Sequence, residues 1–145
     1  MSLVDRPPFR FAVRTRVGFD ETDAQGIVYY GRYMPYFDRA RVEYLRNLDL
    51  LAQAPGAPEF VMRAQWTEYH APARFDDELC VFVRVCRLGR TSLTWEFLAE
   101  NVASSARLAT AQQTMVQVDP ERRRPVEVVV AIRRAVSEFE QEVEA

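Results

Sequence analysis

The chain has 145 residues, a formal net charge of −2 and an apolar fraction of 48%, which is enough for a domain with its own core. The slightly negative charge disfavours nucleic acid as a partner. Apolar runs fall short of the roughly 18 residues that span a membrane, and residues 1–10 lack an apolar signal core. We therefore expect a cytoplasmic protein with one domain over 1–145.

The first half of the sequence predicts a strand followed by a long helix. Residues 9–20 alternate, with Phe9, Phe11, Val13, Val17 and Phe19 on one face, as in a half-buried strand. From 31 to 50 the apolar residues instead follow helical spacing and form a broad stripe. This stripe predicts a helix buried along much of its length, and the Ala-Pro-Gly-Ala-Pro run at 54–58 breaks the chain after it.

The second half predicts successive strands and a terminal helix. The first of these strands begins at Phe60 and ends before Pro72, and the later strands cover 79–88, 93–99 and 108–118. Successive strands joined by short turns favour an antiparallel sheet, and one long helix can cover one of its faces. Residues 130–143 are expected to form a charged, exposed helix. The predicted class is α+β.

The segment most informative about chemistry runs from Phe19 to Tyr30, with the sequence Phe-Asp-Glu-Thr-Asp-Ala-Gln-Gly-Ile-Val-Tyr-Tyr. It places Asp23 ahead of the predicted helix, with Gly26 between them. A helix start presents unpaired N–H groups and a partial positive charge, which can hold an oxyanion. Asp23 beside it is a candidate nucleophile or base. Aspartates ahead of helices are also common caps, so both interpretations stay open.

Three stretches carry a family resemblance, and they comprise Asp20, Asp23, residues 26–30, Tyr33, Tyr36, Phe37, Ala40 and Arg41, then residues 69–77, then residues 89–93. Together they resemble the hotdog-fold acyl-CoA thioesterases of the 4-hydroxybenzoyl-CoA thioesterase-like group. The similarity covers roughly residues 11 to 119, and its first motif is the most specific. It implies an antiparallel sheet of about five strands curled around one long central helix.

The resemblance assigns roles near the helix start. It implies Asp23 as nucleophile or general base, and the backbone N–H of Tyr30 as oxyanion donor. Asp20 and Glu21 are competing carboxylates without that motif position. Many relatives carry histidine after the glycine, where this chain has Ile27, so the acyl group stays open. The expected substrate-binding residues are Gly26, Ile27, Tyr29 and Tyr33, although a glycine can serve only a turn and the tyrosines only the core.

The resemblance also implies partners. CoA phosphates are expected at Arg87, Arg90 and Ser92, which otherwise form an exposed basic turn. An acyl-carrier-protein thioester is a possible substrate, and a homodimer or homotetramer is expected. No cofactor is implied, and the single His70 leaves too few ligands for a zinc site. The alternative function is a non-catalytic hotdog module that binds acyl-CoA or an acyl-carrier protein.

Overall fold

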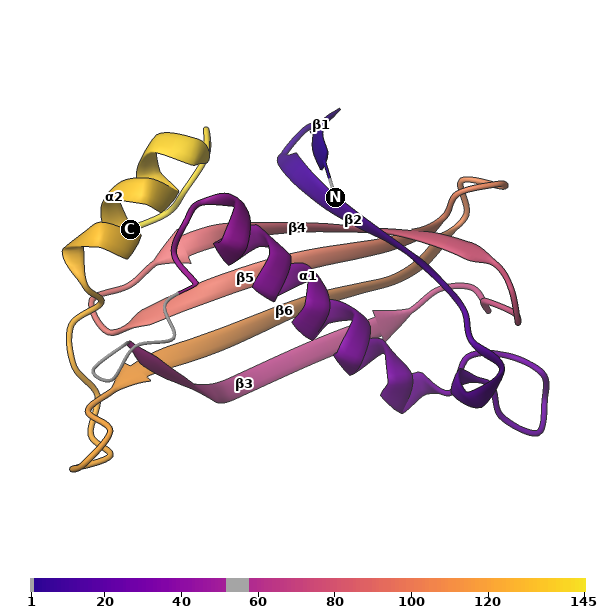
Figure 1. Cartoon of the computed structure of the whole chain (residues 1–145), viewed down its shortest axis with the longest axis horizontal. Helices are drawn as coiled ribbons and strands as arrows, with labels where there is room; N and C mark the ends of the chain where they lie inside the picture. The colour runs from indigo at the N-terminus through magenta and orange to yellow at the C-terminus, as the bar shows by residue number, and fades with distance from the viewer. Residues whose placement is uncertain (1, 52–57) are drawn as a thin grey trace.

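The strands form one six-stranded sheet with the spatial order β1-β2-β4-β5-β6-β3, and every neighbouring pair is antiparallel (Figure 1). This computed structural model describes residues 2–51 and 58–145, so the break predicted at 54–58 lies outside the described residues except for Pro58. The strands are β1 (Ser2–Arg6), β2 (Phe9–Arg16), β3 (Glu59–Tyr69), β4 (Glu78–Leu88), β5 (Ser92–Asn101) and β6 (Arg107–Val118).

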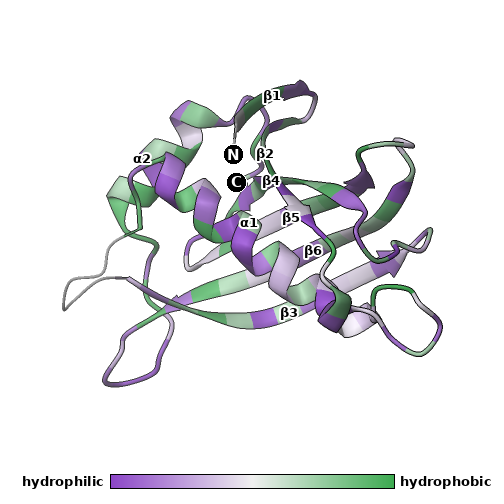
Figure 2. Cartoon of the chain, turned by 45° about the vertical axis from the view of Figure 1, so that its right-hand side comes forward, coloured by the Kyte–Doolittle hydropathy of each residue, from purple (hydrophilic) through white to green (hydrophobic). Residues whose placement is uncertain are grey.

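One long helix, α1 (Tyr33–Asn47), lies across one face of this sheet, directly after a 3-10 turn at Tyr30–Arg32 (Figure 1). Hydrophilic and hydrophobic residues are interspersed along the whole length of α1 (Figure 2). The predicted long helix, the four predicted strands that follow it and the α+β class are confirmed, and the arrangement is that of a hotdog fold. Its buried residues recur every three or four positions, as a one-sided helix requires: Tyr33, Tyr36, Phe37, Ala40 and Tyr44.

Aromatic pairs between α1 and β5 fill the centre of the core. The rings of Phe37 and Phe97 lie 4.8 Å apart between centroids, and those of Tyr44 and Trp95 lie 5.1 Å apart at 83°. All four side chains are almost completely buried. Edge and offset contacts of this kind add to the free energy gained by burying the rings, so they hold the helix at a fixed place on the sheet.

The first predicted strand is correct in position but wrong in its length and in part of its face. β2 ends at Arg16, and Phe19 belongs to a separate 3-10 turn where its side chain is 77% exposed. Phe9 packs with Ala12 and Phe82 on the face of the sheet away from Phe11. Phe9 directly follows the Pro7–Pro8 turn, so its side chain does not follow the alternation of the strand. β1 was not predicted.

The C-terminal helix α2 (Val130–Phe139) is shorter than predicted and is not simply exposed. Ile132 and Val136 are buried against the main core. Beyond its end, the nearly buried Glu140 accepts hydrogen bonds from Tyr44 Oη at 2.6 Å and from the Val85 N–H at 3.1 Å. Pairing of β2 with β4 reaches only as far as Val83, so Glu140 supplies the acceptor that β2 no longer provides.

Glu140 makes the stability of this junction depend on pH. Burial raises the pKa of Glu140 above its ordinary value, although the hydrogen bonds from Tyr44 and Val85 act in the opposite direction. The folded protein therefore binds this proton more tightly than the unfolded chain. The resulting stabilisation is complete below the ordinary carboxyl pKa and is lost as the pH rises through the raised value.

Glu140→Gln should therefore gain stability relative to the wild type as the pH rises. Glutamine keeps the shape and still accepts both hydrogen bonds, but it does not ionise. Urea unfolding of the two proteins, at a pH below the ordinary carboxyl value and at neutral pH, measures the difference in unfolding free energy. A difference that does not change with pH would show that Glu140 is not buried with a raised pKa.

Candidate active site

Asp23 begins a tight turn in the loop between the 3-10 turn at Phe19–Glu21 and α1. The Asp23 N–H donates to Ile27 O at 2.8 Å, and the Gly26 N–H donates to Asp23 O at 2.9 Å. Asp23 Oδ1 accepts a hydrogen bond from the Gln25 N–H at 2.8 Å. Gly26 has φ of 77°, a conformation that suits glycine. The turn therefore depends on both Asp23 and Gly26.

This geometry replaces the helix-cap interpretation of Asp23. The residue at the N-cap of the 3-10 turn is Tyr29, and the one at the N-cap of α1 is Arg32. The structural task of Asp23 is an Asx turn, in which one carboxylate oxygen satisfies a nearby N–H. A half-buried carboxylate with only one oxygen in the turn can still present its second oxygen to a ligand.

Backbone hydrogen bonds bring the two ends of this loop together. Thr22 and Val28 form an antiparallel bridge, and the Tyr29 N–H donates to Glu21 O at 3.0 Å. The Val28 N–H also donates to Ala73 O at 2.8 Å, which attaches the loop to the connection between β3 and β4. As a result, the Asp23 turn and the start of α1 lie beside each other.

The helix start presents unpaired donors. Within residues 2–51 and 58–145, the N–H groups of Tyr30 and Gly31 have no hydrogen-bond acceptor. The Tyr69 hydroxyl donates to Tyr30 O at 3.2 Å, which ties this turn to the end of β3. Unpaired N–H groups at a helix start carry partial positive charge and bind developing negative charge. The Tyr30 N–H is therefore available to an oxyanion.

Asp23 and Tyr30 line one cleft of about 660 Å³. Its aromatic wall consists of Tyr29, Tyr30, Tyr33 and Tyr69, and the rings of Tyr29 and Tyr30 lie 4.3 Å apart. Burial raises the pKa of Tyr33 to about 12. The neighbouring Tyr30 hydroxyl raises the pKa of Tyr29, and the charge of Asp23 adds to this effect. Both phenols therefore stay neutral at physiological pH.

Most predicted site residues converge here. Asp23, Ile27, Tyr29, Tyr30 and Tyr33 all line the cleft, and Gly26 lies in the same turn. Sequence reasoning did not assign Tyr69 to the site, although residue 69 begins the second motif. His70 also lines the cleft, and its Nε2 lies 3.0 Å from Thr110 Oγ1.

The predicted CoA residues lie at the other end of the sheet. Ser92 pairs with Val116, whereas Tyr69 beside the cleft pairs with Ala109. At about 3.3 Å per residue, the stretch of β6 from Ala109 to Val116 spans roughly 23 Å. In Figure 1 the β4–β5 turn lies at the left and the loop before α1 at the right. Within one chain, therefore, Arg87, Arg90 and Ser92 are not brought to Asp23.

The CoA candidates have local partners of their own. Arg90 Nη1 lies 3.7 Å from Glu127 Oε1, with both side chains highly exposed. The Gly89 N–H donates to Ser92 O at 2.8 Å, which closes the β4–β5 turn. An exposed pair of this kind contributes little to stability, so Arg90 can exchange Glu127 for another anion at small cost.

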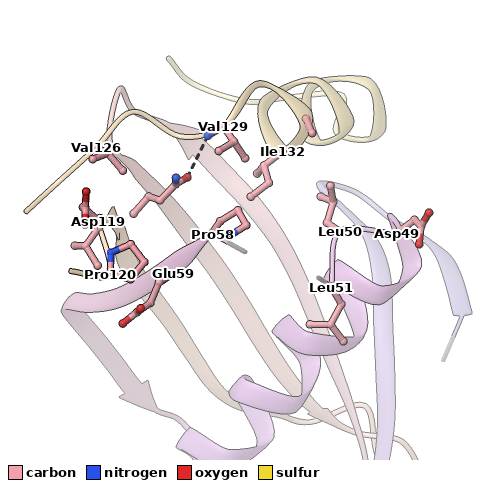
Figure 3. Close-up of a pocket in the computed structure, with 13 residues that line it drawn as sticks. Asp49, Leu50, Leu51, Pro58, Glu59, Asp119, Pro120, Val126, Val129 and Ile132 are labelled. Carbon is pink, nitrogen blue, oxygen red and sulfur yellow. Dashed lines mark hydrogen bonds between the residues drawn. The ribbon is translucent and has the colours of Figure 1, made fainter. Parts of the chain in front are cut away.

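A second hollow, of about 630 Å³, lies between the end of α1, the start of β3 and α2 (Figure 3). Its lining is largely apolar, and the Val129 N–H donates to Gln117 Oε1 at 3.1 Å across one wall. Asp49, Glu59 and Asp119 surround it, which makes it a poor receptor for phosphates. The cleft with Asp23 is therefore the better candidate active site.

The described residues include no helix that is long and apolar enough to cross a membrane. Among the same residues, no cluster of three histidine, cysteine, aspartate or glutamate side chains is arranged to hold a metal ion.

Comparison with known proteins gives the family. The model of the thioesterase superfamily matches residues 25–104, and the chain belongs to this superfamily. The acyl-CoA thioester hydrolase YbgC of Escherichia coli O6:H1 is 37% identical over 135 residues, which cover 92% of this chain and 96% of that protein. The resemblance predicted from the sequence motifs is thus confirmed, and the protein is a thioester hydrolase.

Solved structures agree with this assignment. A thioesterase from Thermus thermophilus, complexed with coenzyme A and Zn, superposes with a TM-score of 0.78 at 26% identity. The superposition covers 92% of this chain and 96% of that protein. The 1,4-dihydroxy-2-naphthoyl-CoA thioesterase Slr0204 from Synechocystis has a TM-score of 0.83 at 20% identity, covering 89% and 96%. The second likeness concerns the fold alone.

The Gly26 turn can be tested without any substrate. A Cβ at Gly26 would meet no atom within 4 Å, so only the positive φ opposes a larger residue there. We expect Gly26→Ala to lower the free energy of unfolding by about 1 kcal/mol, and Gly26→Asn to lose less because asparagine tolerates this conformation. Chemical denaturation compares the three proteins. Equal stability of Gly26→Ala and wild type would contradict the turn assignment.

Proposed function

We propose that this protein hydrolyses acyl-CoA thioesters to the free acid and CoA, with Asp23 and the Tyr30 N–H as its reacting groups. The observation that supports the proposal most is their shared cleft, where a carboxylate lies beside a helix start with unpaired N–H groups. Thioester hydrolysis needs an attacking or activating group and a donor for the carbonyl oxygen as it gains charge. This pair supplies both.

The proposed reaction begins with the thioester carbonyl oxygen accepting a hydrogen bond from the Tyr30 N–H. This donor becomes more effective as negative charge grows on the oxygen. Asp23 then either removes a proton from the attacking water, or attacks the carbonyl carbon to give an anhydride that water opens. In both routes the C–S bond breaks, the CoA thiolate takes up a proton, and water supplies the second oxygen of the acid.

The acyl group would lie against the tyrosine wall and Ile27. Tyr29 and Tyr33 stay neutral, so they offer apolar ring faces and hydroxyl groups without repelling an acyl chain. An acyl-carrier-protein thioester presents the same carbonyl and remains a candidate substrate. Thiol release from aryl, short-chain and long-chain acyl-CoAs, and from an acyl-carrier-protein thioester, ranks these classes.

We further propose a homodimer, or a tetramer built from such dimers, paired along β3. β3 lies at one edge of the sheet, and its Met62 and Trp66 side chains are exposed. Exposed edge strands are usually paired or covered. Antiparallel pairing of two β3 strands would set the Glu59 end of one beside the Tyr69 end of the other. The β4–β5 turn of one subunit, with Arg87, Arg90 and Ser92, would then approach the cleft of its partner.

Asp23→Asn tests the chemistry. Asparagine keeps the shape, and its amide oxygen can still accept the Gln25 N–H, so the fold should persist. It cannot attack the thioester or take a proton from water, so kcat should fall at least about 10²-fold. Steady-state thiol release and binding of a non-hydrolysable acyl-CoA analogue measure the two effects separately.

Asp23→Ala serves as the control for the turn. It removes both the reacting group and the Asx hydrogen bond, so it should also lower stability by about 1 kcal/mol. Full turnover by Asp23→Asn, with reduced stability only in Asp23→Ala, would leave Asp23 as a turn residue and refute the catalytic assignment.

Mixing two variants tests the proposed cross-subunit site. Arg90→Glu should raise KM for acyl-CoA with little change in kcat, whereas the exposed Arg122→Glu should leave both unchanged. Co-expressed Asp23→Asn and Arg90→Glu chains would form hybrid dimers with one intact site. Roughly one quarter of all sites should then show wild-type KM, because half of randomly formed dimers are hybrids.

Three results would contradict the cross-subunit site. Mixed chains without any low-KM activity would place Asp23 and Arg90 in one subunit, whereas a wild-type KM in Arg90→Glu alone would remove Arg90 from the site. Light scattering that shows an active monomer at the assay concentration would exclude the dimer itself.

A further inference from the structure

The proposed chemistry leaves one carboxylate beside the site without a task. Glu21 precedes Asp23 by two residues and is partly buried. Its Oε1 accepts a hydrogen bond from the Gly18 N–H at 2.6 Å and another from Tyr36 Oη at 2.8 Å. A carboxylate that accepts two hydrogen bonds in this way has a fixed orientation, so Glu21 is not a free competitor of Asp23 for the substrate.

Tyr36 connects this carboxylate to the helix. The residue lies on α1, only 5% exposed, and its ring packs edge-on against Tyr33 with centroids 5.7 Å apart. Burial raises the pKa of Tyr36, and the hydrogen bond to Glu21 adds to the effect. The phenol is therefore always protonated at physiological pH and remains a donor to Glu21.

The backbone of Glu21 makes a further contact at the helix start. Its carbonyl oxygen accepts the Tyr29 N–H at 3.0 Å. Tyr29 directly precedes the proposed oxyanion donor, Tyr30. Glu21 thus contacts three parts of the chain. It holds Gly18, which follows the end of β2, and the first turn of α1 through Tyr36. Through Tyr29 it also holds the peptide before the oxyanion donor.

We infer that Glu21 and Tyr36 are positioning residues that set the separation between the Asp23 carboxylate and the Tyr30 N–H. Asp23 follows Glu21 closely along the chain, and Tyr30 is held through Tyr29, so both reacting groups take their places from the same residue. The inference rests on the proposed function. Misplacement of reacting groups by about 1 Å can cost about 10²-fold in rate, so the pair should affect turnover more than binding.

The structure offers a matched control on the same helix. Tyr44 is also a buried tyrosine of α1 that donates to a glutamate, with Oη 2.6 Å from Glu140 Oε2. Its partner lies at the other end of the helix, away from Asp23. Tyr36→Phe and Tyr44→Phe therefore remove the same kind of hydrogen bond from the same element, and they differ in distance from the proposed chemistry.

We expect both variants to unfold at lower temperature, but only Tyr36→Phe to lose turnover. Its kcat on a thioester that the wild type hydrolyses should fall about 10- to 100-fold, with KM within about twofold, whereas Tyr44→Phe should keep both. Glu21→Gln can accept the same hydrogen bonds without charge, so it should retain more kcat than Glu21→Ala. If Tyr36→Phe does not fold, the Glu21 pair carries the comparison.

Combination with Asp23→Asn separates positioning from general destabilisation. If Glu21 and Tyr36 act through Asp23, adding Tyr36→Phe to Asp23→Asn should lower kcat by much less than it does in the wild type. Additive losses, or equal losses in Tyr36→Phe and Tyr44→Phe, would overturn the inference, and so would wild-type kcat in Tyr36→Phe. A fully active Asp23→Asn would instead refute the proposed function, and the inference with it.

Discussion

A helix that starts without a side-chain cap is the constraint on which the rest of this site depends. Neither the 3-10 turn at Tyr30 nor α1 itself has a capping side chain, and the N–H groups of Tyr30 and Gly31 have no acceptor within the described ranges. Uncapped donors cost stability in most helices. Here the loop before the helix folds back through the Asp23 turn, so the open donors and a carboxylate share one cleft.

The remainder of the fold keeps that helix start in place. The contacts of α1 with β5 through Phe37 and Tyr44 fix its position on the sheet, and Tyr69 fixes the first turn from the end of β3. Three carboxylates then have different tasks because their surroundings differ. Asp23 lines an open cleft, Glu21 is held by Gly18 and Tyr36, and Glu140, just beyond the end of α2, is buried with a raised pKa.

The sequence predicted the parts of this structure that depend on local periodicity. The stripe from Tyr33 to Tyr44 and the strands from β3 to β6 are where the pattern put them, and the motif around Asp23 lies in the cleft. β1 was missed because a short edge strand has little pattern of its own. The burial of α2 depends on a tertiary contact, as its buried Ile132 and Val136 show. The location of Arg90 relative to Asp23 depends on sheet topology, which the order of the motifs along the chain does not predict.

The most direct measurement is a crystal structure of Asp23→Asn with an intact acyl-CoA bound. The proposed mechanism predicts the thioester carbonyl oxygen within about 3 Å of the Tyr30 nitrogen, with the carbonyl carbon facing residue 23. A thioester bound elsewhere, for example in the hollow beside Glu59 and Asp119, or a carbonyl oxygen turned away from the start of the helix, would contradict it.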